Sequence, residues 1–209
     1  MELLRGKTLS AAVQKEAPFA LARTIHIALQ VARALREAHV LGIIHRDLKP
    51  GNIMLVEAGD DADFVKVLDF GLVKLIAPES GEAPAPAPDD VDLTRQGTLL
   101  GSPRYMSPEQ IRGEVLDPRT DIYSFGIILF QMAAGRPPFT GSGSVDLIYK
   151  HIHEKPPRVS DVAHGDCPPE LEDLIAQCLE KDRALRFASM ADVITALKQA
   201  RSSITGIIE

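Results

Sequence analysis

The chain has 209 residues, of which 45% are hydrophobic and 25% are charged, and its formal net charge is −6. This composition is typical of a globular protein with a core to bury, and the acidic balance argues against a nucleic-acid-binding protein, which usually carries a basic face. The sequence contains neither an apolar run of about 20 residues that could span a bilayer nor a signal peptide. We therefore expect a cytoplasmic chain, or the cytoplasmic part of a protein whose membrane anchor lies elsewhere.

The first residues predict the end of a strand and a short helix. Residues 1–4 are typical of the tail of an apolar strand, and Gly6 and Lys7 are expected to form a turn. Thr8 can then open a helix over residues 8–15.

A long amphipathic helix is predicted next. Pro18 would start it, because proline is tolerated at a first helical position, where its missing N–H would be unpaired anyway. The apolar stripe recurs at three- and four-residue steps and consists of Leu21, Ile25, Ala28, Leu29, Ala32 and Leu35. Gly42 provides a left-handed stop. We interpret His26 and His39 as packing or capping residues rather than catalytic ones.

Residues 45–52 read His-Arg-Asp-Leu-Lys-Pro-Gly-Asn and concentrate polar side chains in one short stretch. Two short apolar strands are predicted after it, at 53–56 and 64–68, with an acidic turn at 59–61 between them. The second strand leads into Asp69, so the two strands are expected to carry polar groups to one place.

The residue types in this cluster suit phosphate chemistry. Asp47 could accept a proton from a hydroxyl, and Lys49 could hold a phosphate. Asn52 and Asp69 could hold Mg²⁺ through oxygen, which is the ligand that this hard cation prefers.

Proline alternates with alanine, glycine and acidic residues over 77–96, which leaves too little hydrophobicity for ordered structure. We expect a flexible loop with an insertion there. Farther on, Ser107 and Gln110 predict a helix start with a capping box. Helices are predicted at 121–132, 144–153, 168–179 and 189–201, and the first of them is apolar all round and therefore buried. The predicted architecture is mainly helical, with a small sheet beside the polar cluster.

These motifs together resemble those of eukaryotic-type (Hanks-type) protein kinases. Residues 45–52 resemble the catalytic loop, and residues 69–71, Asp-Phe-Gly, resemble the metal-binding triplet. Residues 107–109 resemble the triplet that closes the activation segment, and residues 121–126 resemble the start of the buried central helix. Arg186 resembles the late arginine that pairs with the closing triplet. The motifs occur in family order, and their style is similar to that of bacterial serine/threonine kinases.

The resemblance implies a role for each residue of the polar cluster. Asp47 would orient and deprotonate a Ser/Thr hydroxyl of a protein substrate, and Lys49 would contact the transferring phosphate. Asn52 and Asp69 would hold the two Mg²⁺ ions that accompany ATP, with Mn²⁺ as a possible substitute. Lysine two positions after the catalytic aspartate resembles serine/threonine rather than tyrosine kinases.

The resemblance also implies a nucleotide site near the start of the chain. Residues 1–4 would form the hinge, and the backbone of Glu2 and of Leu4 would meet the adenine edge. Met54 would pack under the adenine, although simple core packing accounts for this methionine equally well.

Further residues would be regulatory or structural. Arg46 would receive a phosphorylated residue of the activation segment, for which Thr94, Thr98 and Ser102 are candidates, the alternative being that these hydroxyls are unmodified. Glu109 and Arg186 would form a buried ion pair. Asp121 would brace the backbone of the catalytic loop, or act as an acid at a helix N-terminus.

The 209 residues lack the Gly-rich phosphate loop, the strand lysine and the helix glutamate of the family's small lobe. The full family fold is α+β with two lobes, so we expect residues 1–209 to be a partial kinase domain that consists of the hinge and the C-terminal lobe. Without its N-terminal lobe, such a chain should bind nucleotide poorly and be inactive.

Two other functions stay open. The chain could be a non-catalytic, kinase-like binding or scaffold fragment, although keeping a fold does not require all four polar residues of the cluster. A phosphohydrolase could use the same metal-binding groups, but nothing in the sequence positions a water nucleophile.

Overall fold

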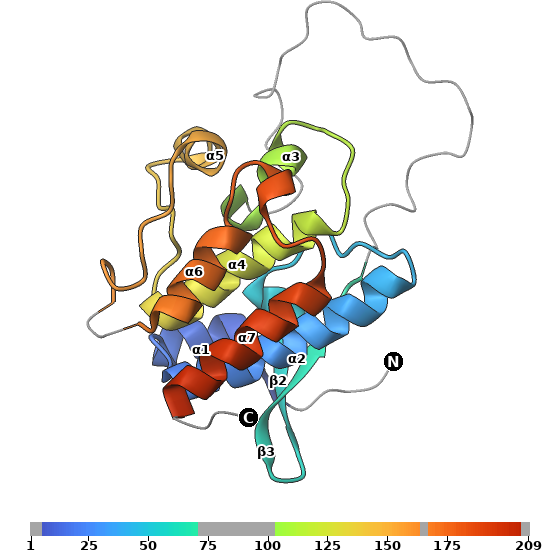
Figure 1. Ribbon diagram of the computed structural model, residues 1–209, viewed down its shortest axis with the longest axis vertical. Helices are drawn as coiled ribbons and strands as arrows, with labels where there is room; N and C mark the ends of the chain where they lie inside the picture. The colour runs from blue at the N-terminus through green and yellow to red at the C-terminus, as the bar shows by residue number, and fades with distance from the viewer. Residues whose placement is uncertain (1–5, 71–102, 164–166, 206–209) are drawn as a thin grey trace, which may run out of the picture.

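Helices make up most of the chain that the computed structural model describes, which is residues 6–70, 103–163 and 167–205 (Figure 1). The elements in chain order, with η for a 3-10 helix, are β1 (Gly6–Thr8), α1 (Leu9–Glu16), α2 (Leu21–Val40), η1 (Pro50–Asn52), β2 (Ile53–Ala58), β3 (Asp61–Val67), η3 (Pro103–Tyr105), α3 (Pro108–Ile111), α4 (Arg119–Ala134), α5 (Ser144–His153), α6 (Pro169–Cys178), η4 (Arg183–Leu185) and α7 (Met190–Thr205). The predicted mainly helical architecture with a small sheet is confirmed. The predicted hinge at 1–4 and insertion at 77–96 lie outside the described residues.

The predicted turn at Gly6 and Lys7 is wrong, because both residues belong to β1. This strand pairs antiparallel with β2, with Gly6 opposite Val56 and Thr8 opposite Met54. A Cβ atom on Gly6 would lie 2.3 Å from the carbonyl oxygen of Leu55. The glycine therefore serves the close approach of two strands rather than a turn. Thr8 ends the strand and caps α1, as predicted, by accepting a hydrogen bond from the first helical turn.

The predicted start of the long helix at Pro18 is also wrong, because α2 begins at Leu21. The side chain of Phe19 is buried, and its backbone N–H donates to the carbonyl of Met132 at 2.8 Å. This bond holds the segment before α2 against the end of α4, so the helix begins three residues after Pro18. The predicted stop is confirmed, since Gly42 follows the helix with a φ of +73°.

The sheet has the order β1-β2-β3, and both pairings are antiparallel. The side-chain amide of Gln30 in α2 covers the outer edge of β3. Its oxygen accepts from the N–H of Val65 at 3.0 Å, and its nitrogen donates to the carbonyl of Asp63 at 3.0 Å. The sheet is thereby attached to α2, and the β2–β3 hairpin extends away from the helices (Figure 1).

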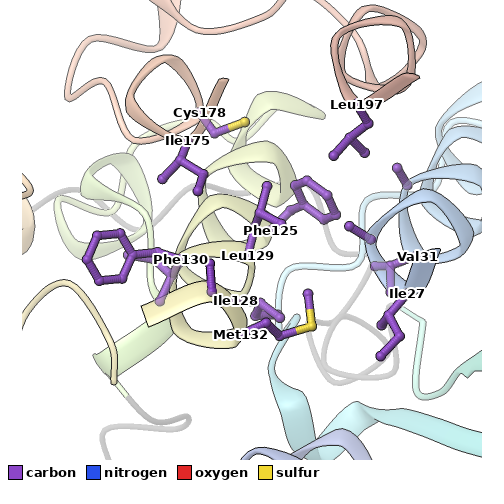
Figure 2. Close-up of a cluster of buried hydrophobic side chains, with 14 of the residues drawn as sticks. Ile27, Val31, Phe125, Ile128, Leu129, Phe130, Met132, Ile175, Cys178 and Leu197 are labelled. Atoms are coloured by element: carbon purple, nitrogen blue, oxygen red, sulfur yellow. The ribbon is translucent and has the colours of Figure 1, made fainter. Parts of the chain in front are cut away.

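The core is built around α4, almost all of whose residues are buried, as the sequence predicts. Figure 2 shows its side chains between those of α2, α6 and α7. Gly126 allows α4 to approach α6 closely, because a Cβ atom there would lie 2.7 Å from the Cβ of Cys178 in α6. The core is closed by α7, which packs along α2 and also contacts α6 (Figure 1). Among the described helices, none combines the length and the apolar character needed to cross a bilayer.

Candidate active site

Residues 45–52 connect the end of α2 to β2, and Asp121 in the first turn of α4 anchors them. One carboxylate oxygen of Asp121 accepts from the backbone N–H of His45 at 2.8 Å, and the other accepts from that of Arg46 at 2.9 Å. The ring Nε2 of His39 also lies 2.7 Å from this carboxylate. Because Asp121 is fully buried, these bonds are shielded from water. The central helix therefore sets the position of the loop.

Arg46 has a φ of +67°, in the left-handed region that residues with a side chain rarely adopt. Such a conformation costs on the order of 1–3 kcal/mol and persists only where the surroundings hold it. Here Asp121 accepts from the N–H of Arg46, and Nε2 of Gln110 in α3 donates to its carbonyl at 2.6 Å. The N–H and the carbonyl of Arg46 are thus both held, and this fixes the position of the backbone that continues into Asp47.

Asp47 receives two donors on one carboxylate oxygen, Oδ2. The ammonium of Lys49 lies 2.6 Å away, and Nδ2 of Asn52 lies 3.2 Å away. The same Nδ2 donates to the backbone carbonyl of Asp47 at 2.8 Å. The side chains of Asp47 and Lys49 are 34% and 32% exposed, whereas Asn52 is buried. The carboxylate of Asp47 and the ammonium of Lys49 therefore lie partly exposed to solvent, while the buried amide of Asn52 holds Asp47 in position.

The segment after β3 is bonded to this loop from both sides. The N–H of Leu68 donates to the carbonyl of Asn52 at 2.8 Å, and Nε2 of His45 lies 2.8 Å from the carbonyl of Leu68. Since a carbonyl only accepts, His45 must carry its proton on Nε2. The ring of Phe70 packs against His45, with 4.9 Å between centroids. Asp69 lies between these contacts, with a φ of +59° and an exposed side chain.

Glu109 and Arg186 form a two-bond ion pair. Nη1 and Nη2 of Arg186 donate to the two carboxylate oxygens at 2.7 and 2.9 Å, and the hydroxyl of Thr120 adds a third bond at 2.9 Å. The side chains of Arg186 and Glu109 are 0% and 3% exposed. Burial by itself would raise the pKa of Glu109, but the guanidinium outweighs burial and holds that pKa below its usual value. This pair fixes α3 to the segment that leads into α7.

Comparison with known proteins identifies the family. The sequence model described as "Protein kinase domain" matches residues 1–199. The chain belongs to the protein kinase family. Serine/threonine-protein kinase pkn3 of Myxococcus xanthus is 42% identical over 193 residues, which cover 90% of this chain and 33% of the relative. Serine/threonine-protein kinase PknA of Mycobacterium tuberculosis is 33% identical over 204 residues, which cover 96% of this chain and 43% of the relative.

Among solved structures, a crystal structure of a double mutant of the Mycobacterium tuberculosis PknI kinase domain is similar to this kinase chain, with a TM-score of 0.67. The match covers 96% of this chain and 64% of that one at 22% identity, so it shows a shared fold. The family model and the sequence relatives confirm the predicted resemblance to bacterial serine/threonine kinases. The chain spans well under half the length of the curated relatives named above, since it covers 33% and 43% of them.

The kinase fold brings Asp47, Lys49 and Asn52 together, as expected. The segment that carries Asp69 is joined to their loop by the hydrogen bonds of Leu68. Met54 lies half-buried in β2, opposite Thr8 and Lys66. The residues that lie outside the described part of the chain are Glu2, Leu4, Thr94, Thr98 and Ser102. Their expected contacts with adenine and their phosphorylation therefore stay predictions.

Two residues do more than their sequence pattern indicated. His39 was expected to pack or cap, and it also contacts Asp121, 82 positions later in the chain. Gln110 was expected to cap α3, which it does, but its amide nitrogen also reaches the carbonyl of Arg46. Neither contact has a local sequence signal, because each depends on where distant elements meet.

Proposed function

We propose that this chain is the large lobe of a protein serine/threonine kinase and that it takes part in phosphoryl transfer from Mg-ATP to Ser/Thr hydroxyls of proteins. One observation carries the proposal. The carboxylate of Asp47 is contacted by Lys49 and Asn52, in a loop that Asp121 ties to the central helix. Phosphoryl transfer needs positioning and charge neutralisation more than covalent chemistry, and this cluster supplies both.

Asp47 is suited to act as the catalytic base. Both donors, from Lys49 and Asn52, bind its Oδ2. Among the described residues, none donates to its Oδ1, so this oxygen is available to accept a proton from a substrate hydroxyl. Lys49 is close enough to move between Asp47 and a phosphate, where its charge would offset that developing in the transition state.

Asn52 and Asp69 have the donor atoms that Mg²⁺ needs. Because Nδ2 of Asn52 donates to the backbone carbonyl of Asp47, its Oδ1 is left for a cation, and no described residue donates a hydrogen bond to this oxygen. The exposed carboxylate of Asp69 likewise has no ion-pair or hydrogen-bond partner within the described ranges. These ranges contain no cluster of three or more His, Cys, Asp or Glu side chains that could hold a metal. Mg²⁺ is commonly held by one or two protein oxygens together with substrate phosphates and water, and that set fits here. Bound Mg²⁺, or Mn²⁺ in its place, would neutralise phosphate charge.

We further propose that transfer requires a small lobe. The 209 residues contain no Gly-rich loop, strand lysine or helix glutamate of the kind that clamps the nucleotide phosphates in kinases. The chain would supply the catalytic base, the metal ligands and the lower wall of the adenine site, with Met54 under the ring and the backbone of Glu2 and Leu4 at its edge.

Arg46 is the proposed receiver of a phosphorylated activation-segment residue, with Thr94, Thr98 and Ser102 as candidates. Its Nε is buried and has no hydrogen-bond partner among the described residues. A guanidinium with an unused donor is suited to a phosphate, which accepts several charge-assisted bonds.

The test is a transfer assay with Mg-ATP and protein substrates, on the 209-residue chain and on the same chain joined to a small lobe. We expect labelling of serine and threonine, but not tyrosine, only from the two-lobed protein. Labelling by the 209 residues alone would contradict the need for a small lobe. A two-lobed protein that folds and binds Mg-ATP without transferring phosphate would favour the non-catalytic scaffold instead.

A further inference from the structure

Gln110, at the third position of α3, makes three hydrogen bonds through its backbone N–H and its side-chain amide. Its backbone N–H donates to Oγ of Ser107 at 3.3 Å, and its side-chain Oε1 accepts from the N–H of Ser107 at 3.0 Å. These two bonds form the capping box of the helix. The third leaves the helix, because Nε2 donates at 2.6 Å to the carbonyl of Arg46, which lies 64 positions earlier in the chain. The orientation of the amide follows from its partners, since Ser107 N–H can only donate and the carbonyl can only accept.

The carbonyl that Gln110 contacts belongs to the peptide unit that leads into Asp47. This unit is planar, so the direction of its C=O fixes the direction in which the chain continues to Asp47. Asp121 already holds the other side of Arg46 through its N–H at 2.9 Å. The left-handed Arg46 is therefore clamped between two helices, with α4 at its N–H and α3 at its carbonyl.

On the basis of the proposed kinase function, we propose that Gln110 is a positioning residue for Asp47. Through Nε2 it couples the helix that closes the activation segment to the peptide that aims the catalytic base. The neighbouring Glu109 is fixed by Arg186, so α3 is a rigid support on that side.

The choice of glutamine at this position supports a second task beyond capping. Glutamate completes a capping box equally well, and its charge is favourable near a helix N-terminus. An ionised carboxylate, however, has no N–H to donate, and it would place an oxygen against the carbonyl of Arg46. Gln110→Glu therefore preserves the cap and replaces the bond to the loop with a repulsive contact between two oxygens. Ser107→Ala does the reverse, because it removes the Oγ acceptor of the cap and leaves Nε2 of Gln110 in place.

The first experiment measures kcat, KM for ATP and thermal unfolding in the chain joined to a small lobe. We expect Gln110→Glu to lower kcat by about 10-fold or more, as misplacement of a catalytic group does, with KM and the unfolding temperature little changed. Ser107→Ala should show the opposite pattern, with lower stability and nearly normal kcat. Gln131→Glu is the matched control for added charge, because Oε1 of Gln131 accepts a bond from the hydroxyl of Tyr105 at 2.9 Å and a carboxylate can still accept it.

The second experiment needs no activity. It follows the carbonyl ¹³C resonance of Arg46 by NMR in the 209-residue chain, because this resonance shifts when a hydrogen bond to the oxygen is lost. We expect a shift in Gln110→Glu and none in Gln131→Glu. A normal kcat in Gln110→Glu would overturn the proposal, and so would an unmoved resonance. If the wild-type protein transfers no phosphate, the proposed function fails, while the resonance still decides whether Gln110 holds the loop.

If Gln110→Glu fails to fold, Gln110→Met takes its place, since it keeps the length of the side chain and loses both side-chain bonds. Its kcat should then fall below that of Ser107→Ala, which lacks only the cap. Equal kcat values in these two variants would assign Gln110 to capping alone.

Discussion

Arg186 and Glu109 form a two-bond ion pair across 77 positions of sequence, and almost no part of either side chain reaches solvent. The other N–H groups of Arg186 donate to backbone carbonyls of Glu180, Arg119 and Lys181. All of its donors are thus used, and α3 is held to the start of α4 and to the segment that follows α6. The pair explains how a helix as short as α3 can be a fixed support for the catalytic loop.

Removal of either Glu109 or Arg186 alone should therefore lower the stability of the folded protein. We expect Arg186→Met to lower the free energy of unfolding by about 3–5 kcal/mol, because it leaves the carboxylate of Glu109 buried without its counter-charge. Urea denaturation of the 209-residue chain measures this. The double variant with Glu109→Gln should recover part of the loss. Arg183→Met is the control, since Arg183 is partly exposed and its loss should cost less than about 1 kcal/mol. Equal losses in the two arginine variants would contradict the account.

Asp121→Asn tests the anchor of the catalytic loop. An amide has only one oxygen, so one of the N–H groups of His45 and Arg46 would face an N–H₂ group in place of an acceptor. We expect a loss of about 1–3 kcal/mol in the free energy of unfolding, the usual cost of an unsatisfied buried donor.

The control for that variant is Asp192→Asn. Oδ2 of Asp192 accepts from Ser189 at an exposed helix start, and asparagine can keep this bond. Unfolding of both variants in denaturant would compare them directly. If Asp121→Asn were as stable as the control, the carboxylate would not be the anchor that its geometry indicates.

Lys181 should make stability depend on pH. Its ammonium contacts the hydroxyl of Tyr123 at 3.2 Å and lies 4.2 Å from the ring centre of Phe139. Burial, reinforced by the charge of Arg186, lowers the pKa of Lys181 from 10.5 to about 7. The folded state therefore binds fewer protons at this group than the unfolded state between pH 7 and 10.5, so the contribution of Lys181 to stability rises across that range.

The measurement compares wild type with Lys181→Met in denaturant at several pH values. The variant lacks the buried ammonium, so its stability relative to wild type should be greatest near pH 7 and should decline toward pH 10. The nearby His151 does not interfere, because burial lowers its pKa to about 4. A difference between the two proteins that stays constant over this range would show that Lys181 keeps an ordinary pKa.

The sequence was informative where structure depends on local patterns. The apolar stripe of α2, the buried α4 and the capping box of Ser107 and Gln110 all follow from spacing and residue type. The pairing of Glu109 with Arg186 followed from a family resemblance, and the structure places the two in contact.

Predictions from the sequence were wrong where the conformation of a residue depends on a contact with a distant part of the chain. Gly6 has the residue type of a turn, but it lies in a strand, at a position where the carbonyl of Leu55 leaves no room for a Cβ atom. Pro18 has the chemistry of a helix start, but the N–H of Phe19 donates to the carbonyl of Met132, and α2 begins only at Leu21. The left-handed Arg46 could not be predicted either, because it depends on bonds from Asp121 and Gln110 that only the fold brings together.

The central claim is that Asp47 is the catalytic base of a protein serine/threonine kinase. The most direct test is the rate of transfer from Mg-ATP to a serine or threonine peptide by the chain joined to a small lobe, with Asp47 or with Asp47→Asn. The variant should fold normally and bind Mg-ATP, while its kcat should fall by about 10²–10⁴-fold, the usual contribution of a general base. A folded Asp47→Asn variant that transfers phosphate at the wild-type rate would contradict the claim.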